Sequence, residues 1–255
     1  MNEIIIDQIP KKLTVELQGT DTLLPEKVLK EHDEYWNERL KENPALRNGD
    51  VYTISDVVSE KEELYIKVNK TNYKHYLYTI NHPDTVAPCK VIYTCSALIT
   101  IDNYIVIGKM NKHTSTPGRL QFAGGGIDAS DLEGEFFNLE KNIKNEIEEE
   151  IGITVGRNTA SFFPKYLKRK GLNDFWAVMY EYNLNYNARE LNEIFESHVN
   201  QLEARGVKPE FSELIFVKRD NEQINQFLLE DSSTKVDYLV PILKKYAESQ
   251  VGIKG

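Results

Sequence analysis

Residues 145–153 read NEIEEEIGI, and this stretch closes a helical pattern. Leu139, Ile143 and Ile147 recur every four residues, which predicts a helix with one buried stripe. Gly152 follows where a glycine commonly ends a helix. The chain is therefore expected to form an acidic helix that stops at Gly152.

Three acids of this helix are expected on one face. Glu146, Glu149 and Glu150 stand at i, i+3 and i+4, so their Cβ atoms should lie about 5–6 Å apart, whereas Glu148 points elsewhere. These carboxylates repel one another, and acids near a helix C-terminus oppose its dipole. A hard cation such as Mg²⁺ relieves the repulsion and bridges to substrate phosphates. Read alone, the segment is more typical of a solvated helix end than of a metal site.

A glycine-rich loop upstream changes that balance. FAGGGID (122–128) follows an apparent strand, and its glycines let the backbone approach a ligand closely and take positive φ. A strand, a GGG loop, a helix with three acids on one face and a closing Gly-Ile form a combination that chance rarely produces. Together they favour a metal site.

The stretch from Gly125 to Ile153 resembles the Nudix box, G-x5-E-x7-R-E-U-x-E-E-x-G-U, where U is a bulky apolar residue. The C-terminal half matches at Glu146, Ile147, Glu149, Glu150, Gly152 and Ile153.

The N-terminal half of the box departs from the pattern. Its spacing is longer, and Glu135 is the nearest match to the first glutamate, with Glu133 as the competitor. Asn145 stands where the family has an arginine that pairs with this glutamate and braces the loop. The departure bears on loop geometry more than on the metal ligands.

The resemblance implies an α+β protein, with a Nudix-type α/β/α sandwich and mixed sheet over residues 89–255. A small α+β domain over 1–88 precedes it, because NHPDTVAPC (81–89) has two prolines and little periodicity. The stretches YWNERLKENPALRNGDVYTI (35–54), KHYLYTI (74–80) and PGRLQFAGGGID (117–128) resemble the UDP-glucose pyrophosphatase-like branch of Nudix proteins, which carries a small domain in front. YKHYLYTI (73–80) is expected as a strand, and Asp102-Asn103 as a two-residue hairpin turn.

Nudix enzymes hydrolyse a nucleoside diphosphate linked to another moiety, so the resemblance implies such a derivative as the ligand, with an NDP-sugar favoured. It assigns Mg²⁺, or Mn²⁺ in its place, to Glu146, Glu149, Glu150 and a backbone carbonyl near Gly125. Catalytic roles fall to Glu149, Glu150 and Glu210, although Glu210 is equally readable as a solvated loop acid. Contacts to the substrate are expected from Arg119, Gly125 and Gly126.

Other interpretations remain open at this stage. A nucleotide-binding sensor without turnover is favoured by Asn145 and the stretched box, and is opposed by the intact acids. Isoprenoid-type isomerisation needs a cysteine near the site, which Cys89 and Cys95 do not supply, so it ranks last. KYLKRK (165–170) reads as an exposed hairpin tip or as a phosphate contact. The aromatic residues Phe175, Trp176 and Tyr180 read as core or as a base-stacking surface.

Composition sets the remaining expectations. The net charge of −9 makes nucleic acid an unlikely default partner. No apolar run reaches the roughly 18–20 residues of a membrane span, and the N-terminus lacks the pattern of a signal peptide. Two cysteines without metal-site spacing are typical of buried thiols in a reducing compartment, so a cytoplasmic protein is expected. Because Nudix proteins are often dimers, the resemblance also suggests a homodimer.

Overall fold

The computed structural model describes residues 3–156 and 159–249, and the chain divides into two compact units. Unit 1 contains Met1–Tyr93, Gly126–Lys141 and Leu167–Ala177, and unit 2 contains Thr94–Gly125, Asn142–Tyr166 and Val178–Gly255. Both combine strands with helices, which confirms the predicted α+β class. The boundary between residues 88 and 89 stays a prediction.

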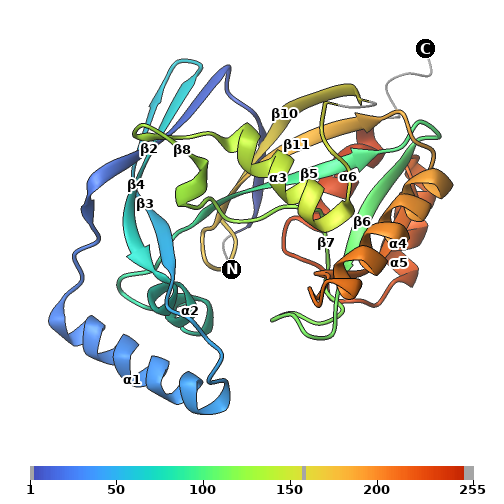
Figure 1. The fold of residues 1–255 in the computed structure, drawn as a ribbon. Coiled ribbons are helices and arrows are strands. Elements are labelled where there is room, and N and C mark those ends of the chain that lie inside the picture. The colour runs from blue at the N-terminus through green and yellow to red at the C-terminus, as the bar shows by residue number, and fades with distance from the viewer. Residues whose placement is uncertain (1–2, 157–158, 250–255) are drawn as a thin grey trace. The chain divides into compact units, whose positions relative to one another are not determined.

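Unit 1 is built on a five-stranded sheet with the order β3-β4-β2-β9-β8 (Figure 1). β2 and β4 run parallel, and the other neighbours are antiparallel. Leu64, Ile66 and Val68 alternate along β4 and are buried, as the two-residue period of a strand requires. The elements of this unit are β1 (Ile5–Gln8), β2 (Lys12–Asp21), α1 (Glu26–Glu42), β3 (Asp50–Glu60), β4 (Glu63–Asn72), α2 (Tyr73–Asn81), η1 (Ala129–Asp131), β8 (Leu132–Glu133) and β9 (Phe136–Phe137).

The predicted strand at 73–80 is wrong, because these residues form α2. The side chain of Asn72 accepts a hydrogen bond from the backbone N–H of His75 and so caps the first turn. His75 and Thr79, four residues apart, are the buried positions. The alternation of aromatic and polar letters suggested a strand, but the cap and the four-residue spacing of the buried side chains define a helix.

The extra residues of the box form a hairpin in unit 1. β8 and β9 pair antiparallel around Gly134 and Glu135, and Gly134 takes the left-handed φ of +66°. The backbone N–H of Leu17 in β2 donates to the carbonyl of Glu135 at 2.8 Å. The insertion is therefore part of the sheet of unit 1.

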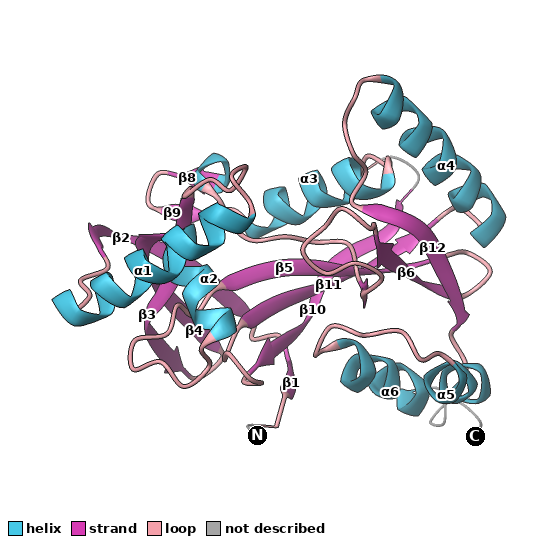
Figure 2. Ribbon diagram, turned by 90° about the horizontal axis from the view of Figure 1, so that it is seen from below, coloured by secondary structure: helices cyan, strands magenta, loops and turns pink. Residues whose placement is uncertain are grey.

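Unit 2 is an α/β/α sandwich. Its strands belong to a sheet with the order β1-β10-β11-β5-β6-β12, in which β7 pairs with β6. α3 and α4 lie on one side of this sheet and α5 and α6 on the other (Figure 2). The elements that lie in unit 2 or run into it are β5 (Ile92–Ile99), β6 (Tyr104–Met110), β7 (Leu120–Gln121), α3 (Leu139–Ile151), β10 (Thr159–Arg169), β11 (Trp176–Leu184), α4 (Ala188–Ala204), β12 (Phe211–Lys218), α5 (Asn221–Glu230) and α6 (Leu239–Ser249).

The hairpin between β5 and β6 has a longer turn than the sequence predicts. Thr100 N–H donates to the carbonyl of Tyr104, which leaves Ile101, Asp102 and Asn103 as the loop. Asn103 has a φ of +65°. A type I turn followed by a left-handed residue is the common three-residue hairpin loop. The predicted two-residue turn is therefore wrong by one residue.

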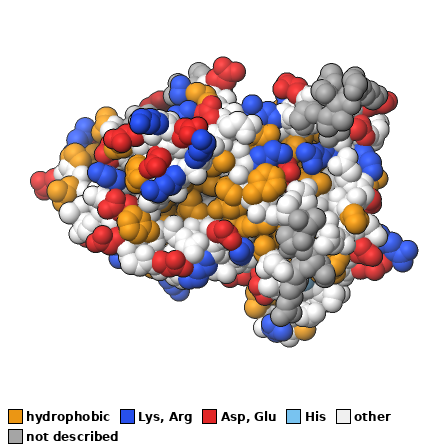
Figure 3. Space-filling view, turned by 90° about the horizontal axis from the view of Figure 1, so that it is seen from above, with side chains coloured by type: hydrophobic (Ala, Val, Ile, Leu, Met, Phe, Trp, Pro, Cys, Tyr) orange, Lys and Arg blue, Asp and Glu red, His pale blue; other side chains and the backbone are white. Residues whose placement is uncertain are grey.

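The surface carries charges of both signs. On the face shown in Figure 3, Lys and Arg side chains are interspersed with Asp and Glu. Among the helices of the part that the structure describes, none has both the length and the apolar character needed to cross a membrane.

Candidate metal centre

The GGG loop leaves β7 and runs beside β5 in unit 2. Ser96 N–H donates to the carbonyl of Ala123 at 2.8 Å, and Thr94 N–H donates to that of Gly125 at 3.0 Å. Gly124 has a φ of +150°, and a Cβ there would lie 2.1 Å from the carbonyl oxygen of Thr94. Only glycine allows the backbone to pass this close to β5.

The Glu146 carboxylate fills the space that a side chain at Gly125 would need. A Cβ built on Gly125 would lie 2.2 Å from Oε1 of Glu146 and 2.5 Å from its Cδ. The absence of a side chain at Gly125 therefore lets the helix acid reach the loop backbone. This contact joins the two halves of the box motif in space.

Glu150 binds the same loop more deeply. Its Oε2 accepts a hydrogen bond from the backbone N–H of Gly124 at 2.8 Å, and the residue is 6% exposed. Burial, followed by the nearby charge of Glu146, raises the pKa of Glu150 well above its ordinary value. The charge of Glu210 and a hydrogen bond with its side chain act in the same direction, while the Gly124 N–H opposes them.

Glu210 comes from a distant part of the sequence. It directly precedes β12, and its carbonyl accepts from the N–H of Asn111 at 2.7 Å. The structure thus brings Glu146, Glu150 and Glu210 together at the glycine loop. Glu213, the third residue of β12, instead pairs with Lys109 at 2.7 Å.

Helix α3 is positioned by its own sequence. Asn138 Oδ1 accepts from the N–H of Lys141 and caps the first turn. Ile143, Ile147 and Ile151 form the buried stripe, each at most 1% exposed. Thr94 Oγ1 on β5 donates to Asn142 Oδ1 at 2.5 Å. With this face against the sheet, the neighbouring acids at i+3 are aimed at the loop.

Glu149 lies differently from its two neighbours. Its side chain is exposed, and its backbone carbonyl is hydrogen bonded to Nε2 of His198 at 2.8 Å. Glu148 is also exposed and accepts from Thr154 Oγ1 at 3.2 Å. The helix turn therefore carries a buried, a half-buried and an exposed acid at the three positions of the motif.

The donor set fits a hard divalent cation. Within residues 3–156 and 159–249, no group of three or more His, Cys, Asp or Glu side chains is arranged so that it could hold a metal ion. Glu146, Glu150 and Glu210 nevertheless interact electrostatically, and like-charged oxygens that converge on one loop are the ligands that Mg²⁺ prefers. The Gly125 carbonyl holds the Thr94 N–H and keeps a second lone pair. The metal role of these residues stays a prediction.

Arg119 and Gly126 are the two remaining substrate-contact candidates. Arg119 is half-buried directly before β7, and its Nη2 donates to Gln121 Oε1 at 2.6 Å. Gly126 is exposed, and a Cβ there would meet nothing within 4 Å. Their contact with substrate stays a prediction.

The departures from the box lie at exposed positions. Asn145, which replaces the family arginine, is exposed on α3, and Glu135 is exposed in the hairpin turn. Glu133, the competing match, accepts from Asn138 Nδ2 at 2.8 Å.

The basic run at 165–170 is not an exposed hairpin tip. It lies mostly in β10, and its first cation, Lys165, pairs with Glu181 at 2.5 Å. Lys168 is 1% exposed and donates to the carbonyl of Phe175 at 2.9 Å. Arg169 pairs with Asp7 of β1. Internal partners hold these cations, which the sequence could not show because each partner is distant along the chain.

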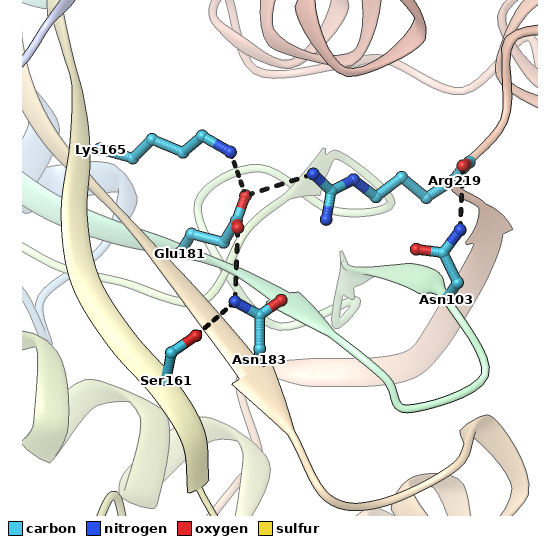
Figure 4. A network of polar contacts seen from close by, with 6 residues as sticks. All are labelled: Asn103, Ser161, Lys165, Glu181, Asn183 and Arg219. Atoms are coloured by element: carbon cyan, nitrogen blue, oxygen red, sulfur yellow. Dashed lines mark hydrogen bonds and ion pairs between the residues drawn. The ribbon is translucent and has the colours of Figure 1, made fainter. Parts of the chain in front are cut away.

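A buried polar network on the other side of unit 2 escaped the sequence reasoning (Figure 4). Glu181 on β11 is paired with Lys165 and approached by Arg219 at 3.9 Å, while Asn183 donates to Ser161 Oγ at 2.6 Å. Burial alone would raise the pKa of Glu181, but the hydrogen bond and charge of Lys165 hold it below its ordinary value. Tyr246 of α6 also donates to Glu181, so the network fixes α6 to the sheet.

Tyr180 and the two cysteines belong to the core, whereas Phe175 and Trp176 are half-buried. Tyr180 is 5% exposed and stacks on Phe162 with ring centroids 5.0 Å apart. Phe175 stacks on Tyr76 in unit 1 at 5.6 Å. Cys89 and Cys95 are both buried thiols, as expected, and burial raises the pKa of Cys89 to about 12.

No protein-family model matches the chain, and no curated protein matches it either. Among solved structures, DR0079 from Deinococcus radiodurans is similar with 13% identity and a TM-score of 0.46, over 77% of this chain and 98% of that one. The MutT protein from Methanosarcina mazei Go1 is similar with 14% identity and a TM-score of 0.39, over 65% of this chain and 96% of that one. The Nudix domain of Shewanella oneidensis NrtR, solved with ADP ribose, is similar with 12% identity and a TM-score of 0.40, over 69% of this chain and 97% of that one. At these identities and TM-scores, the three proteins say nothing of what this chain binds or cleaves.

Proposed function

We propose that this chain is a Mg²⁺-dependent pyrophosphohydrolase of the Nudix type. Its substrate is a nucleoside diphosphate linked to another moiety, with an NDP-sugar favoured. The observation that carries the proposal is the convergence of Glu146, Glu150 and Glu210 on the GGG loop. An acidic helix end without a function would leave its carboxylates in water. Here Glu150 is buried, and the charges of Glu146 and Glu210 act on it.

The proposed site has a division of labour. Glu146, Glu149 and Glu150, with the Gly125 carbonyl, would hold Mg²⁺, which supplies charge neutralisation for the diphosphate and lowers the pKa of a water. The Gly124 N–H fixes the direction of the Glu150 carboxylate. Glu210 is exposed and hydrogen bonded to Glu150, which supports the proposal that its carboxylate takes a proton from the attacking water. The water oxygen joins one phosphorus atom, and the bridging P–O bond breaks.

A substrate panel with Mg²⁺ or Mn²⁺ tests this proposal. The panel contains UDP-sugars, ADP-ribose, dinucleoside polyphosphates and nucleoside triphosphates. Release of a nucleoside monophosphate and a sugar phosphate is expected. Glu150→Gln should lower turnover at least ~10²-fold, the scale for losing a key charge-stabilising group. Its amide keeps an oxygen for the Gly124 N–H, so the fold should persist. Glu148→Gln removes the same charge from an exposed position on the same turn and should leave turnover unchanged.

A nucleotide-binding sensor is the second candidate. Asn145 and the β8–β9 hairpin favour it, because the arginine–glutamate brace of the box is missing from the sequence. Tight binding of one compound in the panel without any turnover would establish the sensor and refute the hydrolase.

A further inference from the structure

We propose that His198 is a positioning residue that clamps the last turn of α3 and thereby sets where Glu149 and Glu150 stand. This inference rests on the proposed function and adds a residue from outside the box, on α4. Nε2 of His198 lies 2.8 Å from the Glu149 carbonyl oxygen. Because a carbonyl can only accept, Nε2 carries the proton of this hydrogen bond.

The contact supplies what a helix end lacks. The last four carbonyls of a helix have no partner within it. In α3, the carbonyl of Glu148 accepts from Gly152 N–H at 3.1 Å, and that of Glu149 accepts from His198. Both bonds lie in the turn that carries Glu149 and Glu150, one turn beyond Glu146. Their loss would allow this turn to fray and carry two of the expected metal ligands away.

The fit of the imidazole against α3 is close. A Cβ built on Gly152 would lie 2.5 Å from both Cβ and Cγ of His198. Gly152 has a φ of +83°, the left-handed conformation in which glycine ends a helix. The glycine therefore serves two purposes, because it turns the backbone and it leaves room for the ring.

Helix α4 gives His198 a firm base. The helix begins at a capping box formed by Asn187 and Glu190. Leu191 and Phe195 are buried at 0% and 3% exposure, and His198 follows them at i+7 and i+3 on the same face. His198 also lines a surface cavity of about 660 Å³. Because His198 is only half-buried, variants at this position are expected to fold.

The test compares three variants by Mn²⁺ affinity, measured by electron paramagnetic resonance, and by hydrogen exchange of the amides of 148–152. His198→Leu keeps bulk without a donor, and its Mn²⁺ affinity should fall about tenfold, the lower end for a residue that orients a metal ligand. His198→Gln places an amide N–H near the position of Nε2 and should restore most of that affinity. Gln201→Leu, a change in the same cavity, is the control and should behave as the wild type.

The outcomes separate the clamp from the hydrolase. Unchanged Mn²⁺ affinity and exchange in a folded His198→Leu, or failure of His198→Gln to restore them, overturns the clamp. If His198→Leu does not fold, His198→Asn, whose amide falls short of the carbonyl, replaces it in the comparison with His198→Gln. If the wild type binds Mn²⁺ but cleaves no compound, the proposed hydrolase activity is refuted. The positioning role of His198 is then still decided by the Mn²⁺ affinities of the variants. A wild type that binds no Mn²⁺ overturns both the metal site and the positioning role.

Discussion

The three glycines of the loop should respond to alanine in three different ways. Gly124 passes β5 with a φ of +150°, and its new Cβ would meet two backbone atoms, Thr94 O at 2.1 Å and Cys95 Cα at 2.5 Å. Gly125 would meet only the end of a side chain, the Glu146 carboxylate at 2.2 Å. Gly126 would meet nothing within 4 Å. Alanine at Gly124 should therefore perturb the fold, and alanine at Gly125 should perturb the proposed metal site.

The magnitudes follow from what must move. At Gly124, a backbone conformation reserved for glycine costs about 1–3 kcal/mol, and overpacking against β5 adds about 1–3 kcal/mol. Gly124→Ala should thus lower the free energy of unfolding by about 2–6 kcal/mol. At Gly125, Glu146 can rotate away, which costs about 0.5–1.5 kcal/mol at most. Stability should change little there, while metal affinity and turnover fall about 10- to 100-fold, because a proposed ligand is displaced. Gly126→Ala should stay within about 0.5 kcal/mol of the wild type.

Denaturant unfolding and Mn²⁺ titration of the three variants provide the measurement. The comparison of two variants is the most informative. Gly125→Ala is expected to lose metal affinity and keep its stability, whereas Gly124→Ala is expected to lose stability. A Gly125→Ala protein that binds Mn²⁺ and turns over as the wild type does would show that Glu146 is not a ligand. A Gly124→Ala protein as stable as the wild type would refute the path of the loop beside β5.

Two further predictions concern buried ionisable groups away from the site. His32 is fully buried, its ring nitrogens have no hydrogen-bond partner among the residues that the structure describes, and burial lowers its pKa to about 4. The unfolded chain takes up this proton near pH 6.5, so stability should fall as the pH drops from about 6.5 to 4, by about 2 kcal/mol between pH 7 and 4.5. In denaturant unfolding at pH 7 and 4.5, His32→Leu should lose about 2 kcal/mol less stability between the two pH values than the wild type does. An equal loss in both proteins would contradict the role of His32 in this pH dependence. Glu181→Gln leaves Lys165 without its carboxylate and should cost about 2 kcal/mol, less than a fully buried pair because Lys165 is partly hydrated. In a double-mutant cycle with Lys165→Met, additive effects would show that the pair is not coupled.

Local patterns in the sequence predict some elements well, because one physical signal dominates them. The isoleucine stripe and Gly152 define α3, and its buried face and end follow the prediction. α2 shows the opposite case. Its aromatic run satisfies a strand pattern, and the deciding features are the Asn72 cap and the environment of His75 and Thr79, which is tertiary.

The site is predictable only in part for a similar reason. Spacing groups Glu146, Glu149 and Glu150, but it does not place Glu210, whose approach to Glu150 depends on strand order. The ion partners of the 165–170 run are distant in sequence, so their internal pairing has no local signature. His198 follows a buried stripe on α4, yet nothing in its own neighbourhood indicates that it meets the end of another helix.

The burial of the three helix acids follows from their angle to the apolar stripe. At about 100° per residue, with Ile147 as the origin, Glu150 lies about 60° away, Glu146 about 100° and Glu149 about 160°. The observed order of burial is the same, with Glu150 buried, Glu146 half-buried and Glu149 exposed. Glu150 and Glu146 thus reach the loop from the flank of the stripe, held by backbone contacts of their own. Glu149 has the least support from the sheet, so the clamp on its carbonyl is where a small change in geometry should affect the metal site most.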